Sequence, residues 1–493
     1  MTLARYYDES LLEQIGSALP YHLAASEAHA IVLGECGLVS HEVVREILIA
    51  LGGIRQNGGA LLPKGGHIDD LCTSIEACVT EAVGTQAAGY MHTGRSRNDY
   101  FMGIVRMQTR DGLLHLWERV IELQSVLLQR AEEHATTVFP GYTHHVQQAQ
   151  PVTFGHFLLA HHDALARDVN RLRQARTVTD ASPFGAAALA GSRYPIDRRR
   201  LAALLGFRDI LMNTEDACGS RDFQLQVLAS CAILCSSLGR LAESLILYTS
   251  HEFNLVELDD SLCGISSIMP QKKNPVALEL VEVALADNVG RLTASMITLK
   301  GTTLGNSEQT SSCDTRVSEA IATCEWAVSL LTRAVETLRV KATVALDTAQ
   351  SGLATATDVT DILVLEGGLS FREAHGLVGR AVQAFLATRD ACDLRDPAEK
   401  RDLVRMVGAA ARDVLGRDLD IDDDSLLGAL SARQAVLART VLGATAPDEI
   451  QSMLCDSRMR VTRSKADTVQ AEALRAEADH RLREAVAQRL RRD

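Results

Sequence analysis

Three long apolar-periodic stretches most strongly limit the folds open to this chain. Residues 220–250, 276–300 and 316–345 repeat apolar side chains at helical spacing over many turns. Helices this long bury their faces in a bundle, often against other chains. Only 10 prolines occur in 493 residues and aromatic residues make up 4%, so Ala, Leu, Val and Ile build the core. The sequence therefore predicts an all-α fold around a long central bundle.

The length predicts more than one domain, because a single core rarely grows beyond ~250–300 residues. We expect an N-terminal helical domain at residues 1–98, a central long-helix bundle at 99–348 and a small helical C-terminal domain at 349–493. Further segments have helical or loop patterns. Helices are expected at 8–52 (two), 69–83 and 100–137, a glycine-rich loop at 53–66, and a solvated Arg/Ala/Glu-rich helix at 466–493.

Charge and cysteine usage exclude several classes of function. The formal net charge is −13, whereas sequence-independent nucleic-acid binding needs a basic surface. The 11 cysteines are scattered without a Cys-x-x-Cys pair, which favours reduced thiols over disulfides or a metal site. No secretion signal or membrane-spanning apolar run is evident. We therefore expect a cytoplasmic protein with no nucleic-acid or membrane partner.

The segment densest in chemistry precedes the second long stretch. It reads Gly264-Ile265-Ser266-Ser267-Ile268-Met269-Pro270-Gln271-Lys272-Lys273-Asn274-Pro275. Backbone N–H groups at a helix start and two lysines favour an anion, and a hydroxyl there can move a proton. The alternative is an ordinary surface turn, since Ser, Lys, Asn and Pro all favour turns. Residue types alone leave both interpretations open.

Two further segments contain candidate site residues. His92-Thr93-Gly94-Arg95-Ser96-Arg97-Asn98-Asp99 offers arginines and an amide that suit carboxylate recognition, unless it is only a basic surface loop. Thr143-His144-His145-Val146-Gln147-Gln148-Ala149-Gln150-Pro151 places a Thr-His pair in a loop bounded by Gly and Pro. Such a pair is a candidate for acid–base chemistry, whereas a lone His is more often structural.

These three segments resemble the signature sequences of the aspartase/fumarase superfamily, and residues 92–99 resemble the signature loop of argininosuccinate lyases. The resemblance spans about residues 20–460. It implies a three-domain all-α fold, a homotetramer whose core pools helices from four subunits, and sites where three subunits meet. The implied activity is cleavage of an N-substituted aspartate, or a related small dicarboxylate or aminocarboxylate, to fumarate plus an amine. No metal or organic cofactor is implied.

The resemblance also implies a role for individual residues. Ser266 is the expected base, Lys272 stabilises the carbanionic intermediate, and His144 helps protonate the leaving nitrogen. This sequence has one extra residue in the histidine segment, so counting from its other side selects His145 instead. The expected substrate-binding residues are Arg97, Asn98, Thr143, His145, Gln147, Ser267, Asn274 and Ser311.

The chain departs from the argininosuccinate lyase pattern on the side that faces the leaving group. The family has Tyr, Gln and Lys where this chain has Asn306, Ser311 and Asp314. It also has a His at the position of Cys72 and a Gly at that of Ile265. Exchanging a lysine for an aspartate reverses local charge, so we predict a different amine. The expected substrate is argininosuccinate-like or an aminocarboxylate such as an N,N′-linked disuccinate. The alternatives are a genuine argininosuccinate lyase, a nitrosuccinate-type lyase and a non-catalytic crystallin-like homologue.

Overall fold

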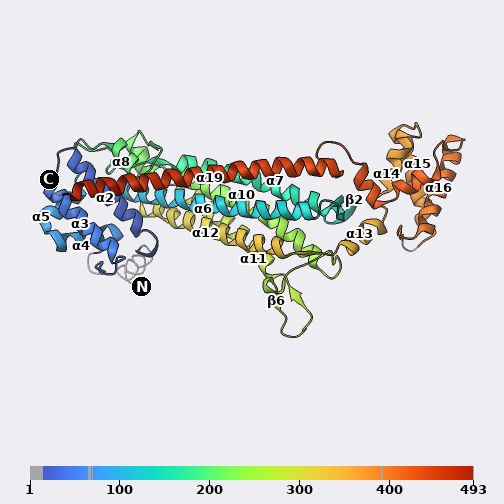
Figure 1. Cartoon of the computed structure of the whole chain (residues 1–493), viewed down its shortest axis with the longest axis horizontal. Coiled ribbons are helices and arrows are strands. Elements are labelled where there is room, and N and C mark those ends of the chain that lie inside the picture. Colours follow the sequence, from blue (N-terminus) through green and yellow to red (C-terminus); the bar gives the residue numbers. More distant parts are fainter. Residues whose placement is uncertain (1–14, 65–67, 69, 390–391, 492–493) are drawn as a thin grey trace.

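The protein is elongated, with a long helical bundle between two groups of shorter helices (Figure 1). The computed structural model describes residues 15–64, 68, 70–389 and 392–491. The chain is 70% helical, which confirms the predicted all-α class. The central bundle contains α6 (Arg97–Glu133), α7 (Phe154–Thr179), α10 (Asp222–Thr249), α11 (Val276–Lys300) and α12 (Glu308–Thr337).

Side-chain caps explain where the bundle helices begin. Ser96 caps α6 and Thr153 caps α7, each accepting a hydrogen bond from a first-turn N–H group. Ser307 and Thr310 form a reciprocal capping box that starts α12 at Glu308. The sequence prediction of 316–345 is therefore shifted, because the capping box begins the helix earlier and the chain leaves it at Leu338 to form a strand.

One apolar core runs the length of the bundle and is shared by α6, α7, α10, α11 and α12. Full burial of each Leu or Val stabilises the fold by about 1.5–3 kcal/mol before entropy is counted. Helix α10 is long and apolar enough by composition to cross a membrane, but it packs against α7, α11 and α12, and 61% of its most apolar window is buried. We interpret α10 as a core helix.

The N-terminal helices pack across one end of the bundle. They are α2 (Leu19–Glu35), α3 (His41–Gln56), α4 (Leu71–Val83), α5 (Thr85–Ala88) and the 3₁₀ helix η1 (Gly89–His92). The loop expected from residue 53 begins only after Gln56, since α3 continues through Gly52 and Gly53. The helix expected at 69–83 is α4, which Asp70 caps; Asp69 and residues 8–14 of the helices expected at 8–52 lie outside the described residues.

Short hairpins and turns connect the helices. Strands β1 (Val138–Thr143) and β2 (Gln147–Thr153) form one antiparallel hairpin, and β6 (Gly264–Ile265) and β7 (Lys273–Asn274) form another. The other connecting elements are β3 (Ala181–Ser182) paired with β4 (Asp209–Ile210), β5 (Val256–Glu257) paired with β8 (Arg339–Val340), α8 (Arg198–Leu204), α9 (Thr214–Gly219) and η2 (Asp260–Leu262).

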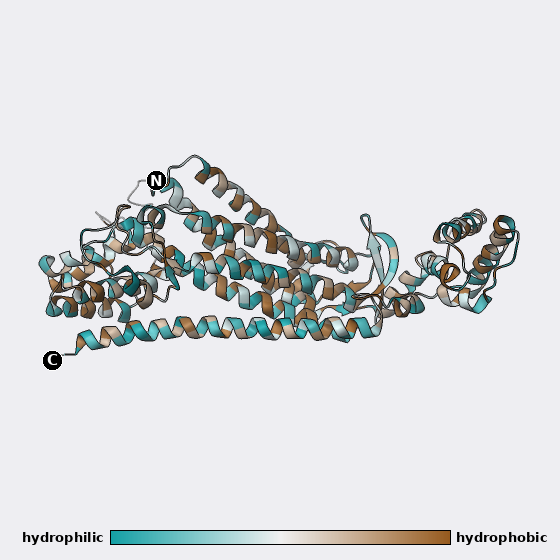
Figure 2. Ribbon diagram, turned by 90° about the horizontal axis from the view of Figure 1, so that it is seen from above, coloured by the Kyte–Doolittle hydropathy of each residue, from teal (hydrophilic) through white to brown (hydrophobic). Residues whose placement is uncertain are grey.

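The helices after the bundle divide into a small unit and one returning helix. The small unit has its own apolar cluster, and its helices are α13 (Ala342–Ser351), α14 (Ala356–Leu365), α15 (Phe371–Leu386), α16 (Pro397–Leu415), α17 (Asp423–Ala429) and α18 (Ala432–Ala438). Helix α19 (Pro447–Leu490) then runs back along the bundle to the N-terminal helices (Figure 2). The expected solvated helix therefore has one buried face, which includes Ala471, Ala478 and Leu482.

The three-domain division stays a prediction. Because α19 packs on α6 and α2, and Leu482 and Ala485 join the N-terminal apolar cluster, we propose that the C-terminal domain ends before residue 447.

Candidate functional site

The start of α6 holds the first two candidate substrate-binding residues. Arg97 and Asn98 occupy the first turn, where unpaired N–H groups favour an anion. Within the chain, Arg97 pairs with Asp70 at 3.3 Å, and the Asn98 amide donates to the Ala188 carbonyl at 3.0 Å. Both side chains are half-buried, so this helix end is held in place and still reachable from solvent.

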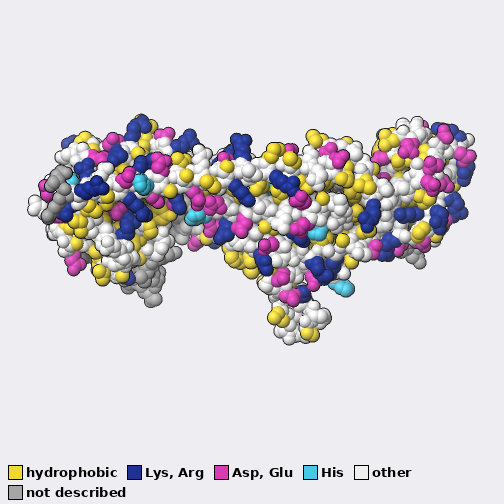
Figure 3. Space-filling model, viewed as in Figure 1, with side chains coloured by type: hydrophobic (Ala, Val, Ile, Leu, Met, Phe, Trp, Pro, Cys, Tyr) yellow, Lys and Arg dark blue, Asp and Glu magenta, His cyan; other side chains and the backbone are white. Residues whose placement is uncertain are grey.

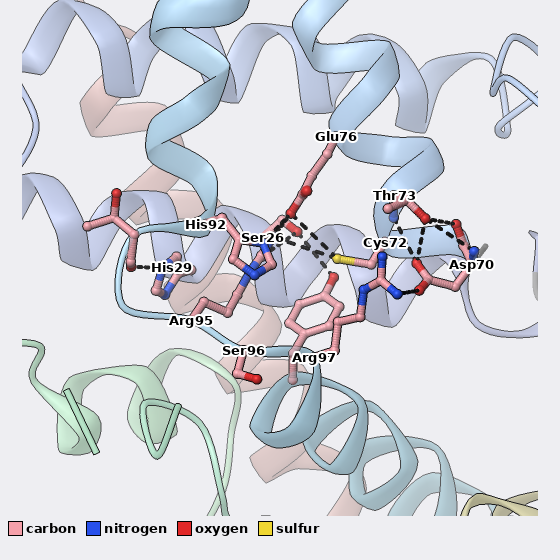
Figure 4. A network of polar contacts seen from close by, with 12 residues as sticks. Ser26, His29, Asp70, Cys72, Thr73, Glu76, His92, Arg95, Ser96 and Arg97 are labelled. Atoms are coloured by element: carbon pink, nitrogen blue, oxygen red, sulfur yellow. Dashed lines mark hydrogen bonds and ion pairs between the residues drawn. The ribbon is translucent and has the colours of Figure 1, made fainter. Parts of the chain in front are cut away.

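A buried polar network lies directly beneath this helix start (Figure 4). The guanidinium of Arg95 donates to Glu76 at 2.6 Å and lies over the ring of Tyr100, while His92 contacts the same Glu76 oxygen at 2.9 Å. Burial alone would raise the pKa of Glu76, but the hydrogen bonds and positive charges of His92 and Arg95 lower it to about 2. The ionised Glu76 therefore fixes the loop that leads into Arg97.

Cys72 belongs to this network and has no acid–base role near neutral pH. Its thiol lies 3.7 Å from Glu76 and 3.8 Å from Arg95. Burial raises the pKa of this thiol to about 12, so it stays protonated.

The β1–β2 turn presents the candidate histidines to solvent. His144, His145 and Val146 all have left-handed backbone angles, with φ of 45°, 54° and 63°. Such angles cost roughly 1–3 kcal/mol per non-glycine residue and cluster at functional sites. The strands close around them by pairing Thr143 with Gln147. The extra residue is thus absorbed in a three-residue turn that exposes both rings and favours neither as the proton donor.

The β6–β7 hairpin carries Ser266 on a projection from the bundle (Figure 1). The Ser266 hydroxyl oxygen accepts the backbone N–H of Met269 at 3.0 Å and that of Ile268 at 3.4 Å. Ser267 is exposed, and Asn274 is half-buried opposite Gly264. Ile265 adopts an extended strand conformation that needs no glycine.

The two lysines of this hairpin are in different environments. Lys273 binds Glu257 at 3.1 Å and also pairs with Asp260, and these carboxylates raise its pKa. Lys272 is exposed and, within the described part of the chain, has no side-chain hydrogen bond or ion pair. Lys272 is therefore the lysine whose charge is available to a ligand.

Of the residues predicted to face the leaving group, Asn306 lies beside Asn98. The Asn306 amide donates to the Asn98 side-chain oxygen at 3.4 Å and accepts from Arg221 at 2.8 Å. Asp314 accepts from Gln224 at 2.6 Å. Arg221 and Gln224 are buried and were not predicted; the signal for them is a cation and an amide within the first residues of the apolar stretch 220–250. Ser311 lies one turn into α12, where its hydroxyl donates to the Ser307 carbonyl.

A single chain does not bring together the start of α6, the β1–β2 hairpin and the β6–β7 hairpin. Helix α6 is 37 residues long, about 55 Å at 1.5 Å per residue, and it separates Arg97 from the β1–β2 hairpin. The β6–β7 hairpin projects from a third position (Figure 1). Among the residues that the structure describes, no group of three or more His, Cys, Asp or Glu side chains is arranged to hold a metal ion.

Comparisons with known proteins extend the resemblance over most of the chain. Residues 17–290 match the Lyase family, and residues 353–426 match the argininosuccinate lyase C-terminal family. An argininosuccinate lyase of Chelativorans sp. is 36% identical over 463 residues, covering 92% of this chain and 94% of that protein. An argininosuccinate lyase 1 of Mesorhizobium japonicum is 37% identical over 433 residues, covering 88% and 89%. The crystal structure of an EDDS lyase in complex with formate is similar with a TM-score of 0.87 and 30% identity, covering 97% and 92%.

Proposed function

The chain belongs to the argininosuccinate lyase family of the aspartase/fumarase superfamily, and on this premise we propose that it cleaves an N-substituted aspartate to fumarate and an amine through Ser266. Family membership makes it a carbon–nitrogen lyase that releases fumarate. The identity of the amine and the residue roles below are part of the proposal.

The observation that carries the proposed mechanism is the pair of backbone N–H groups on the Ser266 oxygen. Two donors aimed at one hydroxyl oxygen favour its alkoxide form and so lower the barrier to proton removal. The alkoxide takes the proton from the carbon next to a substrate carboxylate, and the C–N bond then breaks. Lys272 and Asn274 stabilise the negative charge that builds up on that carboxylate.

The other half of the reaction needs a proton on the departing nitrogen. His144, beside Thr143 on the exposed turn, supplies it; His145 is the alternative donor and otherwise binds substrate. The other proposed substrate-binding residues are Arg97, Asn98, Thr143, Gln147, Ser267 and Ser311. After C–N cleavage Ser266 releases its proton to solvent and the histidine regains one, so overall one proton moves from carbon to nitrogen and no metal or organic cofactor is proposed.

We propose that the active species is a homotetramer in the cytoplasm, because one chain leaves the site incomplete. Helix α11 buries one face against α10 and α12 and exposes a second apolar face. The exposed residues are Leu280, Val283, Val289, Met296 and Ile297. The projecting hairpin likewise exposes 94% of Ile265 and 86% of Ile268, and hydrophobic side chains are visible at its tip (Figure 3). Exposed apolar patches of this kind mark contacts between chains.

Among substrates, the exchanges at Asn306, Ser311 and Asp314 favour an aminocarboxylate such as an N,N′-linked disuccinate over argininosuccinate. The EDDS lyase likeness supports this choice. A genuine argininosuccinate lyase is the second candidate, which the two argininosuccinate lyases of similar sequence favour. A nitrosuccinate-type lyase and a non-catalytic crystallin-like homologue are the remaining alternatives.

Replacing Ser266 by Ala tests the mechanism. The variant should lose ~10²–10⁴-fold in kcat while substrate binding changes little. Ser261→Ala is the matched control, because Ser261 is an exposed serine of the preceding segment whose hydroxyl, among the described residues, hydrogen-bonds only Asp259. Turnover by Ser266→Ala at the control's rate would assign the base to another residue, with Ser267 the next candidate.

A further inference from the structure

Three helix starts converge on one polar cluster beside Asn98. Asn306, directly before the cap of α12, bridges Asn98 at the start of α6 and Arg221 at the start of α10. One turn further along α10, Gln224 donates to the carboxylate of Asp314 on α12. Asn306 is exposed and Asn98 half-buried, whereas Arg221 and Gln224 are buried. The cluster thus extends from the exposed Asn306 to the buried Arg221 and Gln224.

The donors of Arg221 are largely occupied by the protein itself. One terminal nitrogen donates to the carbonyls of Cys218 and Ser220 at 3.2 Å, and the other to Asn306. Only its inner nitrogen, Nε, has no partner in the described chain. Arg221 therefore has few free N–H donors for a carboxylate of the substrate.

The hydrogen-bond acceptors of Gln224 and Asp314, in contrast, are not all occupied by the described chain. Gln224 is fully buried, and its side-chain oxygen Oε1 has no hydrogen-bond partner among the described residues. Only one oxygen of Asp314 accepts a hydrogen bond from the described chain. Burial raises the pKa of Asp314 to about 6, opposed by Arg221 and Gln224, so the carboxylate is ionised at neutral pH. A buried, unpaired acceptor is costly unless a ligand donates to it.

We propose that Asn98, Asn306, Gln224 and Asp314 form an acceptor-rich subsite that selects leaving amines with a second ammonium group. This inference rests on the proposed function and adds the class of the leaving group. An ammonium supplies three N–H donors and a positive charge, which match the Gln224 oxygen and the Asp314 carboxylate. A carboxylate at the same place would be repelled by Asp314, and it would find the terminal nitrogens of the nearby Arg221 already bonded to the protein.

Two substrates of similar length test this subsite. N-(2-aminoethyl)aspartate and N-(2-carboxyethyl)aspartate share the half that becomes fumarate and differ only in the distal group, which is an ammonium in the first and a carboxylate in the second. For the wild-type protein, kcat/KM should favour the aminoethyl substrate by at least ~10-fold, equivalent to about 1.4 kcal/mol. Equal values, or a preference for the carboxyethyl substrate, would overturn the subsite.

Asp314→Asn provides the second arm, because it keeps the acceptor for Gln224 and removes only the charge. This variant should reduce the preference to below ~3-fold with the kcat for the better substrate changed less than the KM. An unchanged preference would contradict the role of Asp314, and if the variant does not fold, the wild-type comparison still decides. Fumarate from other N-substituted aspartates but from neither of these two would refute the subsite alone, whereas fumarate from no substrate would refute the proposed function.

Discussion

Glu76 is the residue whose charge most affects how the α6 start is held. Among the residues that the structure describes, it forms the ion pair with Arg95, whose side chain is only 3% exposed, and it also contacts His92. Glu76→Gln keeps the shape of the side chain and removes the charge, so Arg95 loses its counter-ion in a buried position. We predict that this change destabilises the N-terminal end of the bundle and loosens Arg97 and Asn98.

The structure gives the size of the effect in two ways. Lowering the pKa of Glu76 from 4.5 to about 2 corresponds to about 3 kcal/mol of stability at neutral pH, at about 1.4 kcal/mol per pKa unit. Removing one partner of a buried ion pair costs about 3–5 kcal/mol, and Glu76 is 27% exposed, so the lower end applies. We therefore expect a loss of about 3 kcal/mol in the free energy of unfolding.

The pH dependence has a definite sign. Because the pKa of Glu76 is lower in the folded state, its contribution is complete above about pH 5 and is lost as the pH falls towards 2. The wild-type protein should lose this stability over that range, and Glu76→Gln should not.

Urea unfolding of both proteins, with hydrogen exchange of the first turn of α6, measures the effect. Glu122→Gln is the matched control, since Glu122 pairs with Arg119 in a bridge whose side chains are both more than half exposed, and such pairs contribute at most about 1 kcal/mol. A loss for Glu76→Gln no larger than for the control, with unchanged exchange at α6, would refute the reasoning.

Three other predictions concern the proposed site. Replacing His144 and His145 separately by Asn should cost one variant at least ~10²-fold in kcat and the other less than ~10-fold; equal small losses in fumarate release would remove both from catalysis. Lys272→Met should lower kcat/KM by at least ~10²-fold, whereas Lys273→Met, whose ammonium is already paired with Glu257, should lower it less than ~10-fold; the opposite order would exchange their roles. Argininosuccinate should be cleaved with kcat/KM below ~10⁴ M⁻¹s⁻¹, and a higher value in a steady-state assay would make it the substrate.

The sequence predicted the long helices well because apolar periodicity and capping residues act locally. The helix predicted at 69–83 differs little from α4, Leu71–Val83, because the side chain of Asp70 caps its first turn. The 316–345 prediction missed the start of α12, because the Ser307–Thr310 box lies within a polar segment with no apolar period. The buried face of α19 was missed because small residues such as Ala471 and Ala478 alternate with charged ones and look solvated.

The candidate site was predictable only as separate segments. Ser266, Lys272 and Asn98 were found by their resemblance to family signatures, yet their distances depend on the long helices between them. Arg221 and Gln224 were not found, because a polar residue at a helix start has many ordinary explanations. Arg221 and Gln224 reach the candidate site because α6, α10 and α12 begin side by side in the structure.

Release of fumarate is the most direct test of the central claim. The purified protein would be given a panel of N-substituted aspartates, including an N,N′-linked disuccinate and argininosuccinate, and fumarate and free amine would be quantified together. The account predicts equimolar fumarate and amine from at least one member of the panel other than argininosuccinate, and release from that substrate by Ser266→Ala that is slower by ~10²–10⁴-fold. Fumarate from no member of the panel, or equal release by Ser266→Ala, would contradict it.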